Sequence, residues 1–195
     1  MTTENKKPMN VLAVGIGGQG IIKLSDILSE VTFRAGYDAK KSEIHGLSQR
    51  GGSVTGHIRW SDQVFTPVIP DGEADCLLAL EELEALRYAH MVNPNGIILV
   101  NDFRMYPVTV VTGASEYPAD LQEQLEGYAK VKRVPATALA AEMGNIRMTN
   151  IIMLGAFSNL TPEIPTNIWH EVIRDFLPAK VVDKNLEAFE KGRAL

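Results

Sequence analysis

The 195-residue sequence predicts an α/β fold, in which a mostly parallel β-sheet lies between helix layers and carries an antiparallel hairpin insert. Short apolar, β-branched runs alternate along the chain with segments whose apolar residues recur at helical spacing. A glycine-rich turn joins the first such run to the first helical segment. No internal repeat or linker-like segment interrupts the pattern. Because 195 residues is an ordinary length for one domain, we expect a single domain over residues 1–195.

The first half of the chain supplies the strands that surround the glycine turn. Residues 10–17 are apolar and β-branched, which predicts a buried parallel strand. The next segment carries apolar residues at helical spacing, namely Leu24, Ile27, Leu28 and Val31. Residues 37–44 predict a polar strand, which suits a sheet edge or a surface. Residues 52–60 and 63–69 flank a Ser-Asp pair, and we expect them to form the antiparallel hairpin.

The second half continues the alternation. Residues 74–80 and 96–102 predict buried strands, with a helix over 81–92 and a Pro/Gly turn at 93–96 between them. The remaining expected elements are a helix over 118–129, a short strand over 130–136, and helices over 137–144, 149–160, 166–177 and 183–192.

The 149–160 segment is apolar around nearly its whole circumference. Such a helix is either buried on all sides or forms a subunit contact. Asn150, at its start, is a candidate helix cap. The alternative is that Asn150 faces a partner or a ligand.

Composition excludes several classes of function. The formal net charge is −5 and the pI is near 5.4, which disfavours nucleic acid as a partner. The longest apolar runs fall short of the roughly 20 residues that span a bilayer, and the polar first ten residues are unlike a secretion signal. A single cysteine, Cys76, cannot form an internal disulfide or hold an iron–sulfur cluster, which indicates a reducing compartment. Together with the short apolar runs, this predicts a cytoplasmic protein without a membrane partner.

Gly15, Gly17 and Gly20 match the G-x-G-x-x-G pattern between a strand and a helix. These glycines permit a tight turn, close approach of a ligand to the backbone, and close helix–strand packing. Three interpretations stay open: a tight turn alone, a site for a phosphate or a cofactor fragment, or a protein-contact surface. The candidate cofactor-binding residues are Gly15, Gly17, Gly18, Gln19 and Gly20. Asp38 lies about where a dinucleotide site would place its acidic residue.

A second glycine-rich stretch, SEIHGLSQRGGSV, covers residues 42–54. Its histidine and carboxylate would suit a general acid/base pair, and an arginine beside two glycines would suit a carboxylate or phosphate. The alternative is a solvated loop with a surface pair between Glu43 and Arg50. The candidate residues of a partner- or substrate-facing loop are Glu43, His45, Gln49, Arg50, Gly51, Gly52 and Ser53. Cys76, His57 and His90 are expected to be structural, and His170 is expected at the surface or the edge of the core. No residue group has metal-ligand spacing.

The two glycine motifs in this order, GIGGQGI and SEIHGLSQRGGSV, followed by MTNIIMLGAFS at 148–158, resemble the gamma subunits of the 2-oxoacid:ferredoxin oxidoreductases. The resemblance covers nearly the whole chain and is greatest to the indolepyruvate branch. It implies a Rossmann-like three-layer domain. It also implies an enzyme that oxidatively decarboxylates a 2-oxoacid, forms an acyl-CoA and reduces ferredoxin; in the indolepyruvate branch, arylpyruvates become arylacetyl-CoA.

The resemblance further implies a division of labour between subunits. Thiamine diphosphate, Mg²⁺ and iron–sulfur clusters would lie on a large (alpha) subunit, and the complex as a whole would use coenzyme A and interact with ferredoxin. Asp71 and Gly72 lack the preceding glycine of a thiamine motif, so we expect this chain to bind none of these cofactors alone and to be inactive alone. Its glycine turn and 43–53 loop would then face the large subunit, near the active site or the coenzyme A channel.

Two alternatives to this subunit role remain at the level of sequence. Gly15, Gly17, Gly20 and Asp38 would also suit a stand-alone NAD(P)- or flavin-binding reductase. The apolar 148–160 segment would suit an interaction module that forms a homodimer.

Overall fold

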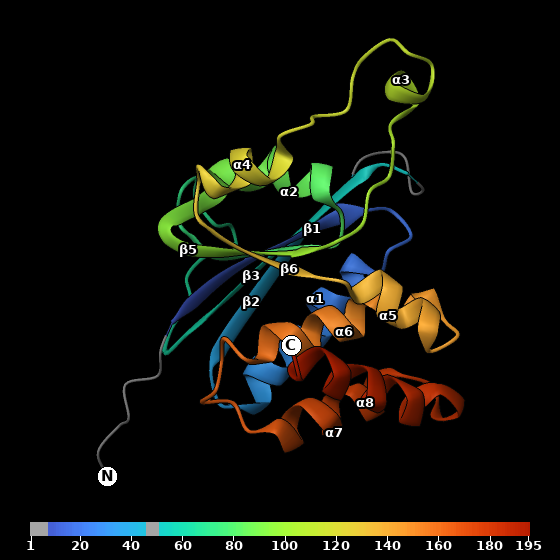
Figure 1. Ribbon diagram of the computed structural model, residues 1–195. Coiled ribbons are helices and arrows are strands. Elements are labelled where there is room, and N and C mark those ends of the chain that lie inside the picture. The colour runs from blue at the N-terminus through green and yellow to red at the C-terminus, as the bar shows by residue number, and fades with distance from the viewer. Residues whose placement is uncertain (1–7, 46–50) are drawn as a thin grey trace.

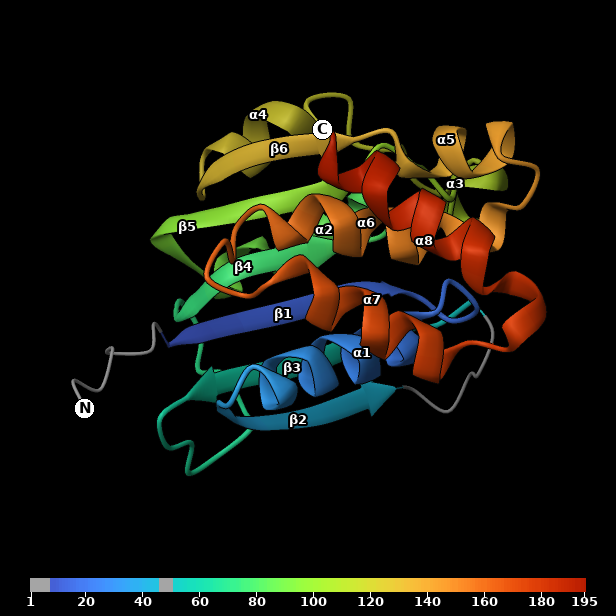
Figure 2. The same cartoon turned by 90° about the horizontal axis from the view of Figure 1, so that it is seen from below.

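The computed structural model describes residues 8–45 and 51–195, with His45 described by its backbone alone. Six strands form one sheet in the order β2-β3-β1-β4-β5-β6 (Figures 1 and 2). The strands are β1 (Met9–Ile16), β2 (Asp38–His45), β3 (Ser53–Ser61), β4 (Ala74–Ala79), β5 (Val92–Asn101) and β6 (Lys130–Val134). Strand β3 pairs antiparallel with both β1 and β2, whereas β4, β5 and β6 continue the sheet in parallel from β1. The predicted mostly parallel sheet with an antiparallel hairpin is confirmed.

Helices cover both faces of the sheet, which gives three layers (Figure 1). The helices are α1 (Ile21–Arg34), α2 (Glu82–Tyr88), α3 (Val108–Val111), α4 (Leu121–Glu126), α5 (Ala136–Glu142), α6 (Thr149–Ser158), α7 (Thr166–Phe176) and α8 (Ala179–Arg193), with short 3-10 turns at Ala89–Met91 and Ile146–Met148. Along the described residues, none of these helices has the length and apolar character needed to cross a membrane.

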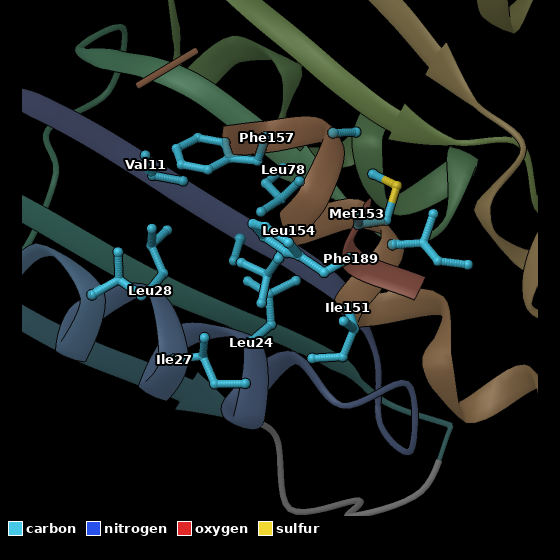
Figure 3. Packing of buried hydrophobic residues seen from close by; sticks show 14 of the residues in the cluster. Val11, Leu24, Ile27, Leu28, Leu78, Ile151, Met153, Leu154, Phe157 and Phe189 are labelled. Carbon is cyan, nitrogen blue, oxygen red and sulfur yellow. The ribbon is translucent and has the colours of Figure 1, made fainter. Parts of the chain in front are cut away.

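The larger core lies between the sheet and helices α1, α6, α7 and α8 (Figure 3). Alternating residues of the central strands, such as Val11 on β1 and Leu78 on β4, point to this face. Leu24, Ile27 and Leu28 of α1 pack against them, as the helical spacing in the sequence predicts. A smaller core on the opposite face packs α2 and α4 against the other set of strand residues.

Helix α6 is buried inside this fold. All ten of its residues are buried, and it packs against α1, α5 and α8. Of the two interpretations of its apolar circumference, burial on all sides is therefore the correct one. Because the chain itself covers α6, this helix offers no exposed face for a homodimer contact.

The predicted hairpin partner is wrong. Residues 63–69 form no strand, and the hairpin consists of β2 and β3. Both edges of β3 are already paired, with β1 and β2, so no edge remains for a third strand. Residues 63–69 instead attach through side chains: the Ile69 N–H donates to His57 Nδ1 at 3.2 Å, and Arg59 donates to the carbonyl of Val68 at 2.9 Å.

Residues 93–96 do not form the predicted turn between a helix and a strand. These residues lie within β5 as an irregularity in its pairing with β4, where Val92 is opposite Ala74 but Ile97 is opposite Cys76. Asn93 stabilises the irregularity by donating to the carbonyl of Ala74 at 3.1 Å. Asn and Pro disfavour a regular strand, but side-chain hydrogen bonds compensate locally.

The chain order of the strands reverses direction across the sheet at β1. From β1 the chain crosses to the edge strand β2 and returns through β3 on one side, and β4, β5 and β6 then follow on the other. In open α/β sheets, ligands bind outside the carboxyl ends of the strands at such a switch point. The glycine turn lies at this point, between β1 and α1.

Candidate functional site: a glycine-lined cavity

The glycine turn is closed by its own glutamine. Gln19 Oε1 accepts a hydrogen bond from the Ile16 N–H at 2.7 Å, and Gln19 Nε2 donates to the Leu80 carbonyl at 3.1 Å. The Gln19 side chain therefore ties β1 to the end of β4. A Cβ on Gly15 would lie 2.8 Å from Gln19 Oε1, so this glycine is required by close packing rather than by a ligand.

Two other glycines, Gly18 and Gly20, adopt positive φ values, and Gly18 also leaves the backbone open. Gly18 has a φ of 105°, and no atom lies within 4 Å of where its Cβ would be. Gly20 has a φ of 85° and precedes α1, whose first helical hydrogen bond runs from the Leu24 N–H to the Gly20 carbonyl. Within the turn, the N–H groups of Gly17 and Gln19 already donate to the Gly52 and Ile16 carbonyls. The N–H groups that favour an anion are therefore those of Gly18 and Gly20 and of the first turn of α1, which take no part in the helix ladder. The positive φ values explain why this turn needs glycine.

The structure brings the two glycine motifs together. The Gly17 N–H donates to the Gly52 carbonyl at 2.8 Å, and the Gly51 N–H donates to the Gly17 carbonyl at 3.4 Å. Next to them, Ser53 Oγ donates to Glu84 of α2 at 2.5 Å. The end of the second motif is thus held between the glycine turn and α2.

The remaining residues of the second motif have separate positions. Glu43 lies in β2 and forms an ion pair with Lys41 at 2.9 Å, and Lys41 also pairs with Asp26 of α1. Of His45 the structure describes the backbone, opposite Val54 on β3. Gln49 and Arg50 lie outside the described residues. The acid/base pair and the surface pair of Glu43 with Arg50 therefore stay predictions.

A cavity of about 510 Å³ opens beside the glycine turn. Its lining comes from four places in the chain and comprises Gly17, Gly18, Gln19, Gly20, Phe103, Met105, Thr137, Ile146, Arg147, Thr149 and Asn150. Among the described residues that line it, Arg147 carries the only charge. The cavity thus combines backbone N–H groups and one guanidinium with apolar walls, a combination suited to a ligand with an anionic part and an apolar part.

Asn150 is part of this cavity and does not cap α6. The residue at the N-cap of α6 is Met148, which makes no side-chain capping bond. Asn150 Nδ2 instead donates to the Gly20 carbonyl at 3.3 Å. A Cβ on Gly20 would lie 2.6 Å from Asn150 Nδ2, so helix α6 packs directly on the glycine turn. The capping prediction is wrong, and the alternative, that Asn150 faces a ligand site, agrees with the geometry.

Sequence reasoning missed the other walls of the cavity. Phe103 and Met105 follow β5, and Ile146 and Arg147 precede α6. Each pair lies in a connection whose sequence has no recognisable motif. The only available signal was their position in the sequence. Phe103 and Met105 follow the carboxyl end of a predicted strand, and Ile146 and Arg147 precede the 148–158 stretch that resembles the family.

Asp38 does not belong to the site. It is the first residue of β2, and it pairs with Ser61 at the end of β3 that lies farthest from the glycine turn. His45, seven residues further along β2, is level with Gly15 through Val54. At roughly 3.3 Å per strand residue, Asp38 lies about 23 Å away from that level. Asp38 instead accepts hydrogen bonds from the Val64 N–H and from Lys40. These bonds, mainly the one from Val64, lower the pKa of its carboxyl group. The carboxylate of a dinucleotide site is therefore missing from the cavity.

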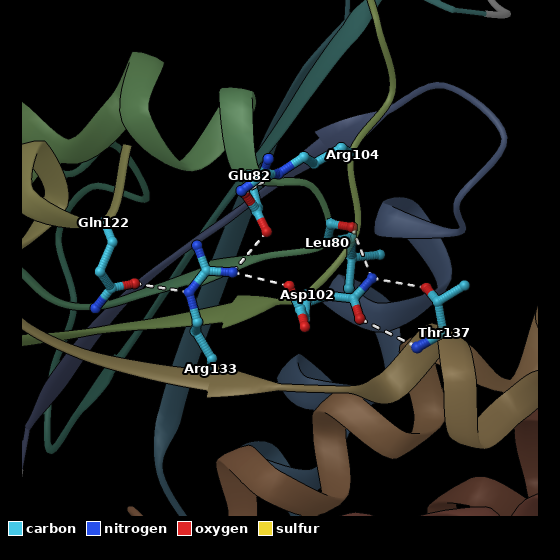
Figure 4. Close-up of polar contacts among 8 residues, drawn as sticks. Leu80, Glu82, Asp102, Arg104, Gln122, Arg133 and Thr137 are labelled. Atoms are coloured by element: carbon cyan, nitrogen blue, oxygen red, sulfur yellow. Dashed lines mark hydrogen bonds and ion pairs between the residues drawn. The ribbon is translucent and has the colours of Figure 1, made fainter. Parts of the chain in front are cut away.

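A buried ionic network supports the wall formed by residues 103–105 (Figure 4). The buried Glu82 carboxylate pairs with Arg104 at 2.8 Å and with Arg133 at 2.6 Å, and Arg133 also contacts Asp102. Burial disfavours the ionised form of Glu82, but the hydrogen bonds from the two arginines outweigh it and hold its pKa below the usual range. Glu81, next to it, accepts from the Met105 N–H at 3.0 Å, and burial raises its pKa.

The residues do not fit the redox cofactors that the resemblance implies. No group of three or more His, Cys, Asp or Glu in the described part of the chain could hold a metal ion. Cys76 is buried in β4, away from the cavity lining. Asp71 and Gly72 lie in a turn that precedes β4, at the end of the sheet where β4 begins rather than at the cavity.

Known proteins are similar to this chain in sequence and in fold. Indolepyruvate oxidoreductase subunit IorB of Pyrococcus horikoshii is 37% identical over 194 residues, which cover 95% of each chain. The gamma subunit of the keto/oxoacid ferredoxin oxidoreductase of Geobacter sulfurreducens superposes with a TM-score of 0.70 at 23% identity, over 94% of this chain and 95% of that one.

A further structure is a 2-oxoglutarate:ferredoxin oxidoreductase from Magnetococcus marinus with 2-oxoglutarate, coenzyme A and succinyl-CoA bound. It matches with a TM-score of 0.75 and 24% identity over 97% of this chain, but only 31% of the longer chain. Residues 10–195 match the family described as pyruvate ferredoxin/flavodoxin oxidoreductase. The match spans nearly the whole sequence and includes both glycine motifs and every wall of the cavity, so the chain belongs to this family of oxidoreductases.

Proposed function

We propose that this chain is the small, gamma-type subunit of an indolepyruvate-type 2-oxoacid:ferredoxin oxidoreductase. The specificity for arylpyruvates is supported by the similarity to the IorB subunit along almost the full length of both chains. The thiamine diphosphate, the Mg²⁺ and the iron–sulfur clusters belong to a larger partner subunit in this proposal, as does the contact with ferredoxin. The chain acts as one gamma-type domain, and its single buried cysteine suits a reducing cytoplasm.

The observation that carries the proposal is the cavity built where the two glycine motifs meet. It offers backbone N–H groups, one guanidinium and apolar walls. Among the described lining residues there is no carboxylate, thiol or imidazole that could act as a nucleophile or a general base. The site is therefore built to hold a molecule and not to transform it.

We further propose that the molecule is coenzyme A. Its phosphates would meet the N-terminal turn of α1 and the Arg147 guanidinium, and its pantetheine chain would lie along Phe103, Met105 and Ile146. The related Magnetococcus enzyme was solved with coenzyme A bound. When bound, coenzyme A supplies the thiol that accepts the acyl group from the partner's active site. The glycine turn and residues 51–53 beside it then face that subunit.

The test is reconstitution with the large subunit of the same enzyme. The complex should reduce viologen in the presence of an arylpyruvate and coenzyme A, and either subunit alone should not. Arg147→Ala should raise the KM for coenzyme A about tenfold or more, because a charge-assisted contact is lost, and should leave the KM for the arylpyruvate unchanged. Arg174→Ala, at an exposed arginine of α7 away from the cavity lining, is the matched control. Full activity of the large subunit without this chain would refute the subunit role.

A further inference from the structure

An arm of the chain, residues 103–117, leaves the body of the molecule between β5 and α4 and carries the short helix α3 (Figure 1). Its base is fixed. The Glu82 N–H donates to the Phe103 carbonyl, Glu81 accepts from the Met105 N–H, and Tyr106 packs edge-on against Tyr117. Beyond this base, the hydrogen bonds recorded for residues 107–116 within the described chain join arm residues to one another. The arm is thus held firmly at its root and supported only by itself at its tip.

The tip is apolar and exposed. Val108 is 77% exposed and Val111 is 73% exposed; they lie three residues apart, on one face of the α3 turn. Tyr106, nearer the base, is 54% exposed. Residues 105–115 include no charged side chain, in a chain in which 22% of residues are charged. A protruding surface of this composition matches the charge-depleted centre of a protein interface and not an ordinary solvated loop.

The position of the arm indicates which partner covers it. Phe103 and Met105 belong both to the arm and to the wall of the glycine-lined cavity. A partner that closes the cavity therefore also meets the arm. The absence of charge over residues 105–115 calls for an uncharged, apolar recess on that partner, because a charged surface would lose its hydration without gaining a counter-charge.

We propose that the arm is an anchor, and that Val108 and Val111 insert into an apolar recess of the large subunit beside the cavity. This inference rests on the proposed subunit function. It is consistent with the Magnetococcus enzyme, in which the matching fold makes up 31% of a longer chain, so that in that protein the equivalent of this chain is covalently joined to other parts. In a separate polypeptide, a non-covalent anchor must supply that connection.

The experiment compares two double variants of the full chain in binding to the large subunit. Val108→Asp with Val111→Asp places two charges on the arm. Phe33→Asp with Phe65→Asp places two charges on side chains that are 64% and 86% exposed, at the end of the molecule opposite the cavity. The arm variant should raise the Kd at least tenfold, mainly through faster dissociation, and the control variant should bind like the unmodified chain. If the aspartates perturb folding, a second arm variant replaces them: Val108→Thr with Val111→Thr, which preserves side-chain shape. This variant should also raise the Kd for the large subunit.

The outcomes separate this inference from the proposed function. If the unmodified chain binds the large subunit and the arm variants bind equally well, the anchor is wrong and the subunit role stands. If the unmodified chain does not bind the large subunit, both fail. If the arm substitutions instead convert a dimer of the isolated chain into monomers, the arm covers a second copy and the proposal is overturned.

Discussion

Cys76 illustrates how far a single residue can be interpreted from sequence. It lies in the middle of β4 with no exposed surface, and burial raises the pKa of its thiol far above the usual range. The thiolate is the reactive form, so the folded chain should not react with Ellman's reagent near pH 8. One equivalent should react after unfolding in guanidinium chloride. A fast reaction of the folded chain would show that β4 opens, or that the thiol is not in the core.

His57 gives a prediction for the dependence of stability on pH. Its Nδ1 accepts the Ile69 N–H, and burial, followed by the nearby Arg59, lowers its pKa. The unfolded chain therefore takes up a proton near pH 6.5 that the folded chain takes up only at lower pH. The free energy of unfolding should fall as the pH drops below about 6.5, by at most about 1.4 kcal/mol per pH unit, and the fall should end at the folded pKa.

Urea unfolding of the native chain and of His57→Asn at pH 7.5 and pH 5.5 tests this. Asparagine keeps an acceptor near the Ile69 N–H but does not titrate. Glu81, whose pKa burial raises, contributes with the opposite sign, because it favours the folded state as the pH falls. The difference between the two proteins isolates His57. Equal pH dependence in both would assign the effect to other groups.

At this scale, sequence reasoning succeeded where a residue's own chemistry decides its place and failed where a distant segment decides it. A lone cysteine within an apolar run, and a histidine within a strand, were expected to be structural, and both are buried. Asn150 was expected to cap its own helix, but its side chain donates a hydrogen bond to the carbonyl of Gly20, 130 residues away in the sequence. Arg147 has no local motif, and only the packing of α6 on the glycine turn makes it part of the cavity.

At the scale of elements, the backbones of α6 and α8 pack closely together, because a glycine from each helix lies at their contact. A Cβ on Gly192 would lie 2.0 Å from the carbonyl oxygen of Ile152, and one on Gly155 would lie 2.0 Å from that of Phe189. Gly192→Ala should therefore force the helices apart and destabilise the chain by about 2 kcal/mol, despite the better helix propensity of alanine. The melting temperature should fall by roughly 4–8 °C.

Gly127→Ala is the matched control for this substitution. Gly127 ends α4 with a φ of −65°, and its nearest backbone neighbour is 3.3 Å from the added Cβ, so its effect should stay within about 1 kcal/mol. Differential scanning fluorimetry of both variants is sufficient. Equal melting temperatures for Gly192→Ala and the native chain would mean that α8 can move away from α6 without cost.

The elements themselves were predictable to different degrees. Apolar periodicity identified the central strands and helices α1, α6, α7 and α8, because each buries a continuous face. The hairpin failed because residues 63–69 look like a strand locally, whereas pairing depends on which edge of β3 is free. The arm helix α3 was not predicted, since its apolar residues are exposed and follow no core periodicity.

At the scale of the whole molecule, the two ends of the sheet differ in character. The end that holds the carboxyl termini of β1, β4 and β5 carries the joined glycine motifs, the cavity and the uncharged arm. The opposite end carries Asp38 and residues 62–73, which are attached to β3 by side chains such as Arg59 and His57. The fold therefore leaves one end open at the cavity and the arm and closes the other with its own chain.

This polarity leads to a prediction for hydrogen–deuterium exchange. Binding of the large subunit should slow exchange of the backbone amides at residues 15–23, 51–53, 103–113 and 146–150, because these amides lie around the cavity and along the arm. Residues 62–73, at the opposite end of the sheet, serve as the internal control and should exchange at an unchanged rate. Protection of 62–73 without protection of 15–23 would mean that the partner docks at the opposite end, away from the cavity. Protection at the cavity end by coenzyme A alone, confined to 15–23 and 146–150, would identify the part of this surface that holds the ligand and leave the arm to the partner.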